Sequence, residues 1–124
     1  MARILVIDDE EPIQFAVQIM LQKENHEILT ASNGEIGLEL LRNEPFDLVI
    51  TDILMPEKGG IEVIAEIQKT KPEVKIIAMS AGGARGDLNF LEHAQLLGAE
   101  AVLQKPFERE EILDLVKEVL QKDD

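Results

Sequence analysis

The sequence predicts an α/β fold in which five βα units build a doubly wound parallel sheet. Short apolar runs alternate with longer amphipathic patterns five times within 124 residues. The apolar runs are hydrophobic almost throughout, which is typical of strands that are buried on both faces by helices. This length suits one domain, and a content of 45% hydrophobic residues suffices for a core. We therefore expect a (βα)5 sheet with right-handed crossovers.

Five apolar runs are the expected strands: Ile4–Ile7, Ile28–Ala31, Leu48–Thr51, Ile76–Met79 and Ala101–Leu103. The first helix is expected to begin near Pro12, because proline fits the first turn of a helix. Its inward residues recur at helical spacing: Ile13, Ala16, Val17, Met20 and Leu21. For the second helix, Ser32 and Glu35 form a candidate capping box. The expected inward residues of this helix are Ile36, Leu40 and Leu41.

Three more helices complete the alternation. The third is expected from about Gly60 to Thr70, with these residues facing the core: Ile61, Ile64, Ala65 and Ile67. A fourth covers about Asp87–Leu97 and stops at Gly98, since glycine commonly follows a helix end. The last covers about Glu108–Gln121, and its expected inward residues are Ile112, Leu115, Val116 and Val119.

The charge and the composition exclude several classes of function. The chain has 12 Lys+Arg and 25 Asp+Glu, a net charge of −13, which argues against direct binding to DNA. Because it has no cysteine, disulfides, thiol nucleophiles and thiolate metal sites are excluded. No apolar run approaches the roughly 20 residues that span a bilayer, and no secretory segment is evident. We expect a cytoplasmic protein without membrane insertion.

Polar side chains follow four of the five expected strands. Ligands of doubly wound sheets bind beyond the carboxyl ends of the strands. Asp8 and Asp9 follow the first strand, Asp52 the third, Ser80 the fourth and Lys105 the fifth. If the first and third strands are neighbours, the three carboxylates converge and repel one another. A hard divalent cation would remove this conflict, and Mg²⁺ suits so sparse a set of oxygen ligands.

Together, these groups are suited to phosphoryl transfer, in which positioning and charge neutralisation dominate catalysis. An aspartate can itself be the nucleophile and form an aspartyl phosphate. Asp52 is the expected phosphoacceptor because its strand is central, which leaves Asp8 and Asp9 as metal ligands.

Four segments in this order resemble the receiver domain of two-component response regulators: Ile4–Glu10, Asp47–Pro56, Met79–Ala81 and Lys105–Phe107. The resemblance covers essentially the whole chain, so residues 1–124 are expected to form one receiver domain. It implies the flavodoxin-like strand order 2-1-3-4-5. It also implies that Asp52 accepts a phosphoryl group from a sensor histidine kinase or a histidine phosphotransfer protein.

The resemblance further assigns the metal ligands. It implies that Asp9 binds Mg²⁺ directly and Asp8 largely through water. Asp52 and the backbone carbonyl of Leu54 would complete the protein's share of the coordination. Gly60 stands where the family has the glycine of the following turn.

The resemblance also implies a switch. Lys105 would pair with the phosphoryl oxygens, and its peptide bond to Pro106 would be cis. Ser80 would swing toward the phosphoryl group and move its loop. The resulting change would be read by a downstream protein on the surface of the fourth helix, fifth strand and fifth helix.

The chain departs from the family at the switch. Most receivers carry Tyr or Phe three residues before the lysine, where this chain has Val102. A valine cannot rotate a ring into the space that Ser80 leaves. The segment Gly82–Gly86 is unusually rich in glycine, and we hypothesise that ordering of this loop substitutes for the ring.

The leading hypothesis is a stand-alone signalling module, which at most catalyses its own phosphorylation and dephosphorylation. A receiver cut from a larger regulator or hybrid kinase is the first alternative. A Mg²⁺-dependent phosphohydrolase of the haloacid dehalogenase kind is the second, but that class places its acids two residues apart, whereas Asp8 and Asp9 are adjacent. A scaffold that is never phosphorylated is the third. His26 and His93 are expected to be surface residues without a ligand role.

Overall fold

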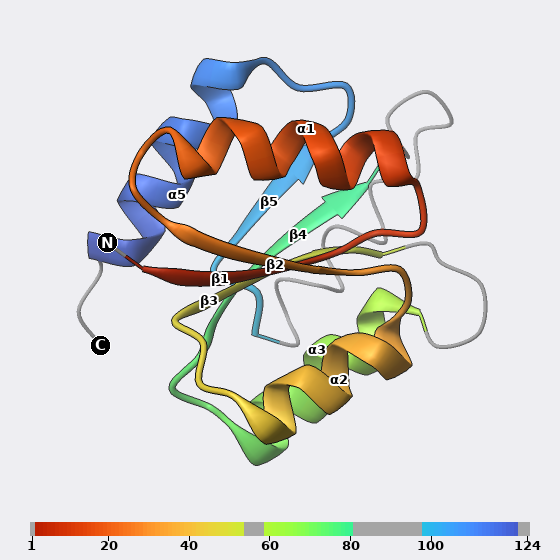
Figure 1. Cartoon of the computed structure of the whole chain (residues 1–124). Helices are drawn as coiled ribbons and strands as arrows, with labels where there is room; N and C mark the ends of the chain where they lie inside the picture. Colours follow the sequence, from red (N-terminus) through yellow and green to blue (C-terminus); the bar gives the residue numbers. More distant parts are fainter. Residues whose placement is uncertain (1, 54–58, 81–97, 122–124) are drawn as a thin grey trace.

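The strands form one parallel sheet. The computed structural model describes residues 2–53, 59–80 and 98–121 (Figure 1). Within these ranges the strands are β1 (Arg3–Ile7), β2 (Glu27–Ala31), β3 (Leu48–Asp52), β4 (Lys75–Ser80) and β5 (Ala101–Gln104). They lie in the order β2-β1-β3-β4-β5, and every neighbouring pair is parallel. Both the fold class and the strand order expected from the sequence are confirmed.

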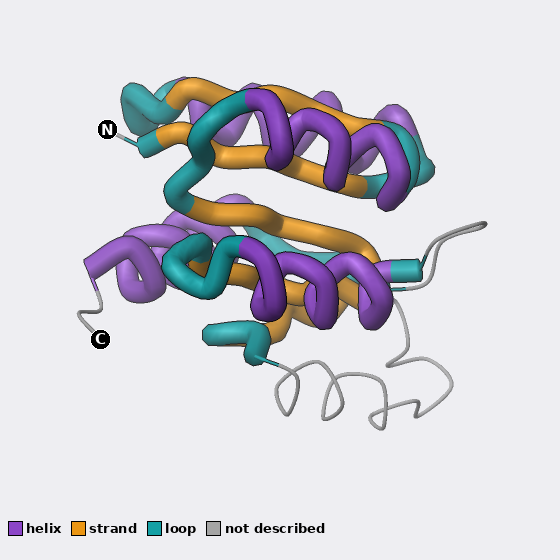
Figure 2. The backbone as a smooth tube through the Cα atoms, turned by 90° about the horizontal axis from the view of Figure 1, so that it is seen from below, coloured by secondary structure: helices purple, strands orange, loops and turns teal. Residues whose placement is uncertain are grey.

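Helices cover both faces of the sheet. The helices α1 (Glu11–Gln22) and α5 (Arg109–Gln121) pack on one face, and α2 (Gly34–Asn43) and α3 (Gly60–Thr70) pack on the other (Figures 1 and 2). The side chains of β1 show how one strand serves both layers. Ile4 and Val6 join the cluster under α1 and α5, whereas Leu5 and Ile7 join the cluster under α2 and α3. This alternation follows from the period of two in a strand, and it explains why the strands are apolar throughout.

The predicted helix bounds agree with the structure to within one or two residues where it describes them. The expected fourth helix, about Asp87–Leu97, lies outside the described residues. None of the helices in the described part of the chain is long and apolar enough to cross a membrane.

The capping box predicted for α2 is wrong. The residue that caps this helix is Asn33, whose side-chain oxygen accepts the N–H of Ile36 at 2.9 Å. The helix therefore buries Leu38 and Leu41, while Ile36 is 45% exposed instead of facing the core. Asparagine and serine are both good N-caps, so residue type does not tell which of the adjacent Ser32 and Asn33 begins the helix.

One inward position in α3 was also mispredicted. Ala65 is exposed, and the buried face consists of Val63, Ile64 and Ile67. An alanine is small enough to fit either side of an amphipathic pattern, so the larger Val63 determines which side packs on the sheet.

The register of the strands brings their carboxyl ends to the same edge. Ile7 of β1 lies opposite Thr51 of β3, and Asp52 lies opposite Met79 of β4. Ser80 at the end of β4 lies opposite Gln104 of β5. The residues that follow these strands therefore share one end of the molecule.

Candidate functional site

Three carboxylates converge at the carboxyl end of the sheet. Asp8 directly follows β1, and Asp52 is the last residue of β3. One oxygen from each of Asp8, Asp9 and Asp52 lies within 4.8 Å of the others. Asp8 and Asp52 are buried, whereas Asp9 is exposed. The first and third strands are neighbours, and their pairing brings the three acids together.

Lys105 supplies the positive charge of this pocket. Its Nζ lies 2.7 Å from Asp8 Oδ2 and 3.4 Å from Asp52 Oδ2, and its side chain is only 8% exposed. Burial by itself lowers the pKa of Lys105, but the hydrogen bond to Asp8 and the charge of Asp52 outweigh it and raise the pKa above its usual value. The ammonium group therefore stays protonated at neutral pH and links two of the three aspartates.

Backbone hydrogen bonds hold the strand ends in place. The N–H of Lys105 donates to the carbonyl of Ser80 at 2.8 Å, and the N–H of Ile53 donates to the carbonyl of Met79 at 2.9 Å. Ser80 is fully buried. The peptide bond between Lys105 and Pro106 is cis. Because these contacts join β3, β4 and β5, the side chains of Asp52, Ser80 and Lys105 sit on rigid elements.

Gly60 lets α3 begin directly against the end of β3. Its N–H donates to the carbonyl of Ile53 at 2.8 Å. A Cβ added at this position would overlap the carbonyl oxygen of Asp52 and would lie 2.6 Å from Ile53 Cα. Both obstacles are backbone atoms, so no side chain can rotate away to make room. The close approach requires glycine and fixes the backbone that carries Asp52.

Three polar residues that the sequence analysis did not assign also support the pocket. Gln14 Nε2 donates to the backbone carbonyl of Asp8 at 2.6 Å. Thr51 is fully buried, and its hydroxyl donates to the carbonyl of Asp52 at 3.0 Å. Glu10 Oε1 lies 3.4 Å from Lys105 Nζ. The position of Gln14, one helical turn after Glu10, is a sequence signal that could have found it.

The remaining predicted site residues are distributed as follows. Val102 is half-buried on β5, opposite Ala78, and packs against the cluster under α2 and α3. Leu54, the segment Gly82–Gly86 and His93 lie outside the described residues.

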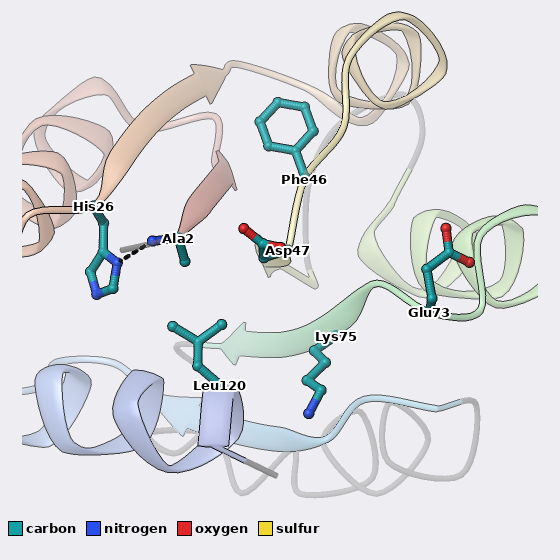
Figure 3. A pocket seen from close by; sticks show the side chains of 7 residues that line it. All are labelled: Ala2, His26, Phe46, Asp47, Glu73, Lys75 and Leu120. Carbon is teal, nitrogen blue, oxygen red and sulfur yellow. Dashed lines mark hydrogen bonds between the residues drawn. The ribbon is translucent and has the colours of Figure 1, made fainter. Parts of the chain in front are cut away.

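His26 is not simply a surface residue, which corrects the expectation from the sequence. It is half-buried, and its Nδ1 accepts the backbone N–H of Ala2 at 3.1 Å (Figure 3). Burial lowers the pKa of this imidazole from its usual 6.5. The acceptor role at Nδ1 requires the neutral ring, so the fold favours that form.

A hollow of about 430 Å³ lies at the other end of the sheet, beside the amino ends of the strands (Figure 3). Its lining comprises Ala2, His26, Phe46, Asp47, Glu73, Lys75 and Leu120. Two of its charged groups already make hydrogen bonds to the backbone. Asp47 Oδ2 accepts the N–H of Arg3 at 2.8 Å, and Lys75 Nζ donates to the carbonyl of Val119 at 3.2 Å. The acidic pocket is therefore the stronger candidate for chemistry.

Comparison with known proteins identifies the family. The family described as response regulator receiver domain matches residues 4–117. The chain therefore belongs to the response regulator receiver domains of two-component systems. Members of this family are signalling modules that take a phosphoryl group from a histidine kinase onto an aspartate, bind Mg²⁺ at an acidic cluster, and signal to downstream targets.

Individual relatives agree with this assignment. The chain is 31% identical over 118 residues to Sporulation initiation phosphotransferase F of Bacillus subtilis, covering 95% of this chain and 93% of that protein. It is 34% identical to Alkaline phosphatase synthesis transcriptional regulatory protein PhoP of B. subtilis, covering 97% of this chain and 49% of PhoP.

A solved structure is similar along its whole length. The response regulator protein TrrA of Thermotoga maritima, in complex with Mg²⁺ and BeF, has a TM-score of 0.82 and 40% identity, covering 96% of this chain and 99% of TrrA. Several other curated relatives are longer, and the chain spans between about a quarter and half of their length.

Proposed function

We propose that Asp52 is the phosphoacceptor of this receiver domain and that its phosphorylation depends on Mg²⁺. The observation that carries the proposal is the convergence of three aspartate oxygens within 4.8 Å, with Lys105 Nζ in contact with two of those aspartates. The donor is a phosphohistidine on a sensor histidine kinase or a histidine phosphotransfer protein. In the reaction, a carboxylate oxygen of Asp52 forms a bond to phosphorus, and the bond between phosphorus and the donor histidine breaks.

The donor set fits a magnesium ion. The available ligands are carboxylate oxygens, which a small hard cation prefers, and a charge of −3 from the aspartates exceeds the +1 of Lys105. In the proposal, Asp8, Asp9, Asp52 and the backbone carbonyl of Leu54 hold the ion. When bound, Mg²⁺ neutralises charge on the phosphoryl oxygens. Asp9 is the accessible ligand, since it is exposed while Asp8 and Asp52 are buried.

The buried groups beside Asp52 serve as the switch. Phosphorylation adds about −1.5 to −2 charge and three acceptor oxygens. Lys105 and Ser80 contact those oxygens only in the phosphorylated state, so they shift an equilibrium between two conformations. In this proposal Val102 provides no aromatic ring for the usual coupling, and ordering of Gly82–Gly86 takes its place.

The output of the module is a contact with another protein. We place the contact on the face formed by the fourth helix, β5 and α5. Direct DNA binding is not part of the proposal because a net charge of −13 repels phosphate backbones. The proposal treats residues 1–124 as one cytoplasmic, stand-alone receiver, with a larger regulator that contains this domain as the alternative.

Intact mass spectrometry tests the proposal. The chain is incubated with Mg²⁺ and a small phosphodonor such as acetyl phosphate, with Asp52→Asn treated in parallel. We expect one phosphoryl group per chain and none on the variant. An unmodified chain in the presence of an active donor would falsify the proposed role of Asp52. Turnover of small phosphoesters, measured as released phosphate, would instead support a phosphohydrolase.

A further inference from the structure

Lys105 contacts a third carboxylate that does not belong to the proposed metal ligands. Glu10 Oε1 lies 3.4 Å from Lys105 Nζ. The side chain of Glu10 is 62% exposed, whereas those of Asp8 and Lys105 are 0% and 8% exposed. Glu10 therefore reaches the same ammonium group from the solvent side of the pocket.

The backbone of Glu10 is held on both sides, which fixes where its side chain begins. Its N–H donates to Asp8 Oδ1 at 2.8 Å. Its carbonyl accepts the N–H groups of Ile13 and Gln14, at 3.1 and 3.2 Å, as the cap of α1. Rotation of the side chain about its own bonds is therefore enough to bring the carboxylate to Lys105 or to move it away.

This placement opposes the arrival of a phosphoryl group in two ways. The oxygens of an incoming phosphoryl group need the ammonium of Lys105, and Glu10 competes for it. The carboxylate also places a negative charge at the rim that an anionic donor must pass. An exposed charge acts through water and is screened by salt over about 10 Å at 0.1 M, so its effect is moderate and depends on ionic strength.

We propose that Glu10 is a positioning residue that restrains Lys105 in the unphosphorylated chain and thereby slows phosphorylation. The proposal rests on the function proposed above. When Asp52 carries the phosphoryl group, Lys105 moves to the phosphoryl oxygens, and the carboxylate of Glu10 is left without this partner. Glu10 thus favours the unphosphorylated state, and its charge sets the rate at which the module is activated.

The test compares Glu10→Gln with Glu11→Gln. Each variant removes one negative charge near the start of α1, but Glu11 is not among the three carboxylates that Lys105 contacts in the described part of the chain. Two quantities are measured: the initial rate of phosphorylation by acetyl phosphate, and the affinity for beryllofluoride with Mg²⁺. At low salt we expect Glu10→Gln to raise both about three- to tenfold, and Glu11→Gln to change them less than twofold.

Salt and a second substitution separate positioning from a general change of charge. The gain from Glu10→Gln should shrink toward twofold at about 0.5 M salt, where exposed charges are screened. In a Lys105→Met background, the gain from Glu10→Gln should shrink to the part that comes from the charge at the rim, because the lysine partner is gone. Equal gains from the two glutamate variants, or a gain that persists undiminished without the lysine, would overturn the proposal. A wild-type chain that is never phosphorylated on Asp52 would instead refute the proposed function.

Discussion

The two ends of the sheet use charge in opposite ways. At the amino end, the guanidinium of Arg3 pairs with Glu27 at 3.1 Å and Glu44 at 2.6 Å, and it lies 5.1 Å from the centre of the Phe46 ring. These contacts, led by the hydrogen bond to Glu44, raise the pKa of Arg3 above its usual value. Arg3 also donates to the carbonyl of Pro45 at 2.8 Å. Arg3 therefore has fixed partners at the amino end.

The carboxyl end has more negative charge than the fold can neutralise. In the described part of the chain, Lys105 contacts Asp8, Asp52 and Glu10, and Asp9 adds a further carboxylate beside the other aspartates. Such a surplus is a cost to stability that a bound cation removes. Arg3 at the amino end is thus neutralised within the fold, whereas the acids of the carboxyl end leave negative charge for a ligand to neutralise. Metal removal and substitutions at both ends test this difference.

Removal of the metal should have the largest effect on function. Without Mg²⁺, the negative charge of Asp8, Asp9 and Asp52 opposes a phosphoryl group. We expect EDTA to slow phosphorylation by acetyl phosphate at least roughly 100-fold. Intact mass measured over time gives the rate, and restored Mg²⁺ should recover it. An unchanged rate in EDTA would contradict the assignment of this end as a metal site.

Gly60→Ala should have the largest effect on folding. The new Cβ would overlap the carbonyl oxygen of Asp52, a backbone atom that cannot move away cheaply. We expect the free energy of unfolding to fall by about 1–3 kcal/mol or more, as for other overpacked positions.

The neighbouring glycine provides a matched control for this prediction. A Cβ at Gly59 would lie at an ordinary 3.5 Å from the carbonyl oxygen of Ile53. Gly59→Ala should therefore cost less than about 1 kcal/mol, the size of a cap effect. Urea denaturation measures both variants, and equal losses would show that the close approach at Gly60 is not the cause.

Asp9→Asn should stabilise the chain in the absence of Mg²⁺. It removes one of three carboxylates that lie within 4.8 Å of each other, and Asp9 is the one without a contact to Lys105 in the described residues. Two charges 4 Å apart in water interact by about 1 kcal/mol, so we expect a gain of roughly that size. The same variant should lose the stabilisation that Mg²⁺ confers on the wild type. Thermal unfolding with and without Mg²⁺ tests both, and a loss of stability in EDTA would contradict the prediction.

The smallest effect should come from the amino end, through His26. Burial lowers the pKa of His26 below its usual 6.5, so the unfolded chain binds this proton more readily than the folded chain. The contribution of His26 to stability is therefore complete above pH 6.5 and is lost as the pH falls toward the lowered folded-state pKa. His26→Asn keeps an acceptor for the N–H of Ala2 but does not titrate. Unfolding measured between pH 7.5 and 5 should show a shallower loss in the variant, and identical pH profiles would argue against this role.

Much of the fold could be predicted because burial leaves a local pattern. A run such as Ile4–Ile7 is apolar in every position, as is typical of a strand that is covered on both faces. Which side chains of a helix face the sheet depends on how the helix is rotated about its own axis, and this rotation could not be predicted in the same way. Ile36 and Leu38 are both apolar, and only the docking of α2, which begins from Asn33, decides which of them is buried.

In the candidate site, too, some features could be predicted from the sequence and others could not. The sequence is enough to predict which residues gather at the site, since Asp8, Asp9, Asp52, Ser80 and Lys105 each follow an expected strand, and parallel strands end at one edge. The tertiary structure decided the partners. The contact from Glu10 to Lys105 joins residues 95 positions apart, and the fit of Gly60 against Asp52 depends on how closely α3 approaches β3. Such contacts arise from packing between helices and strands, and a local pattern of residue types does not predict how closely two elements approach.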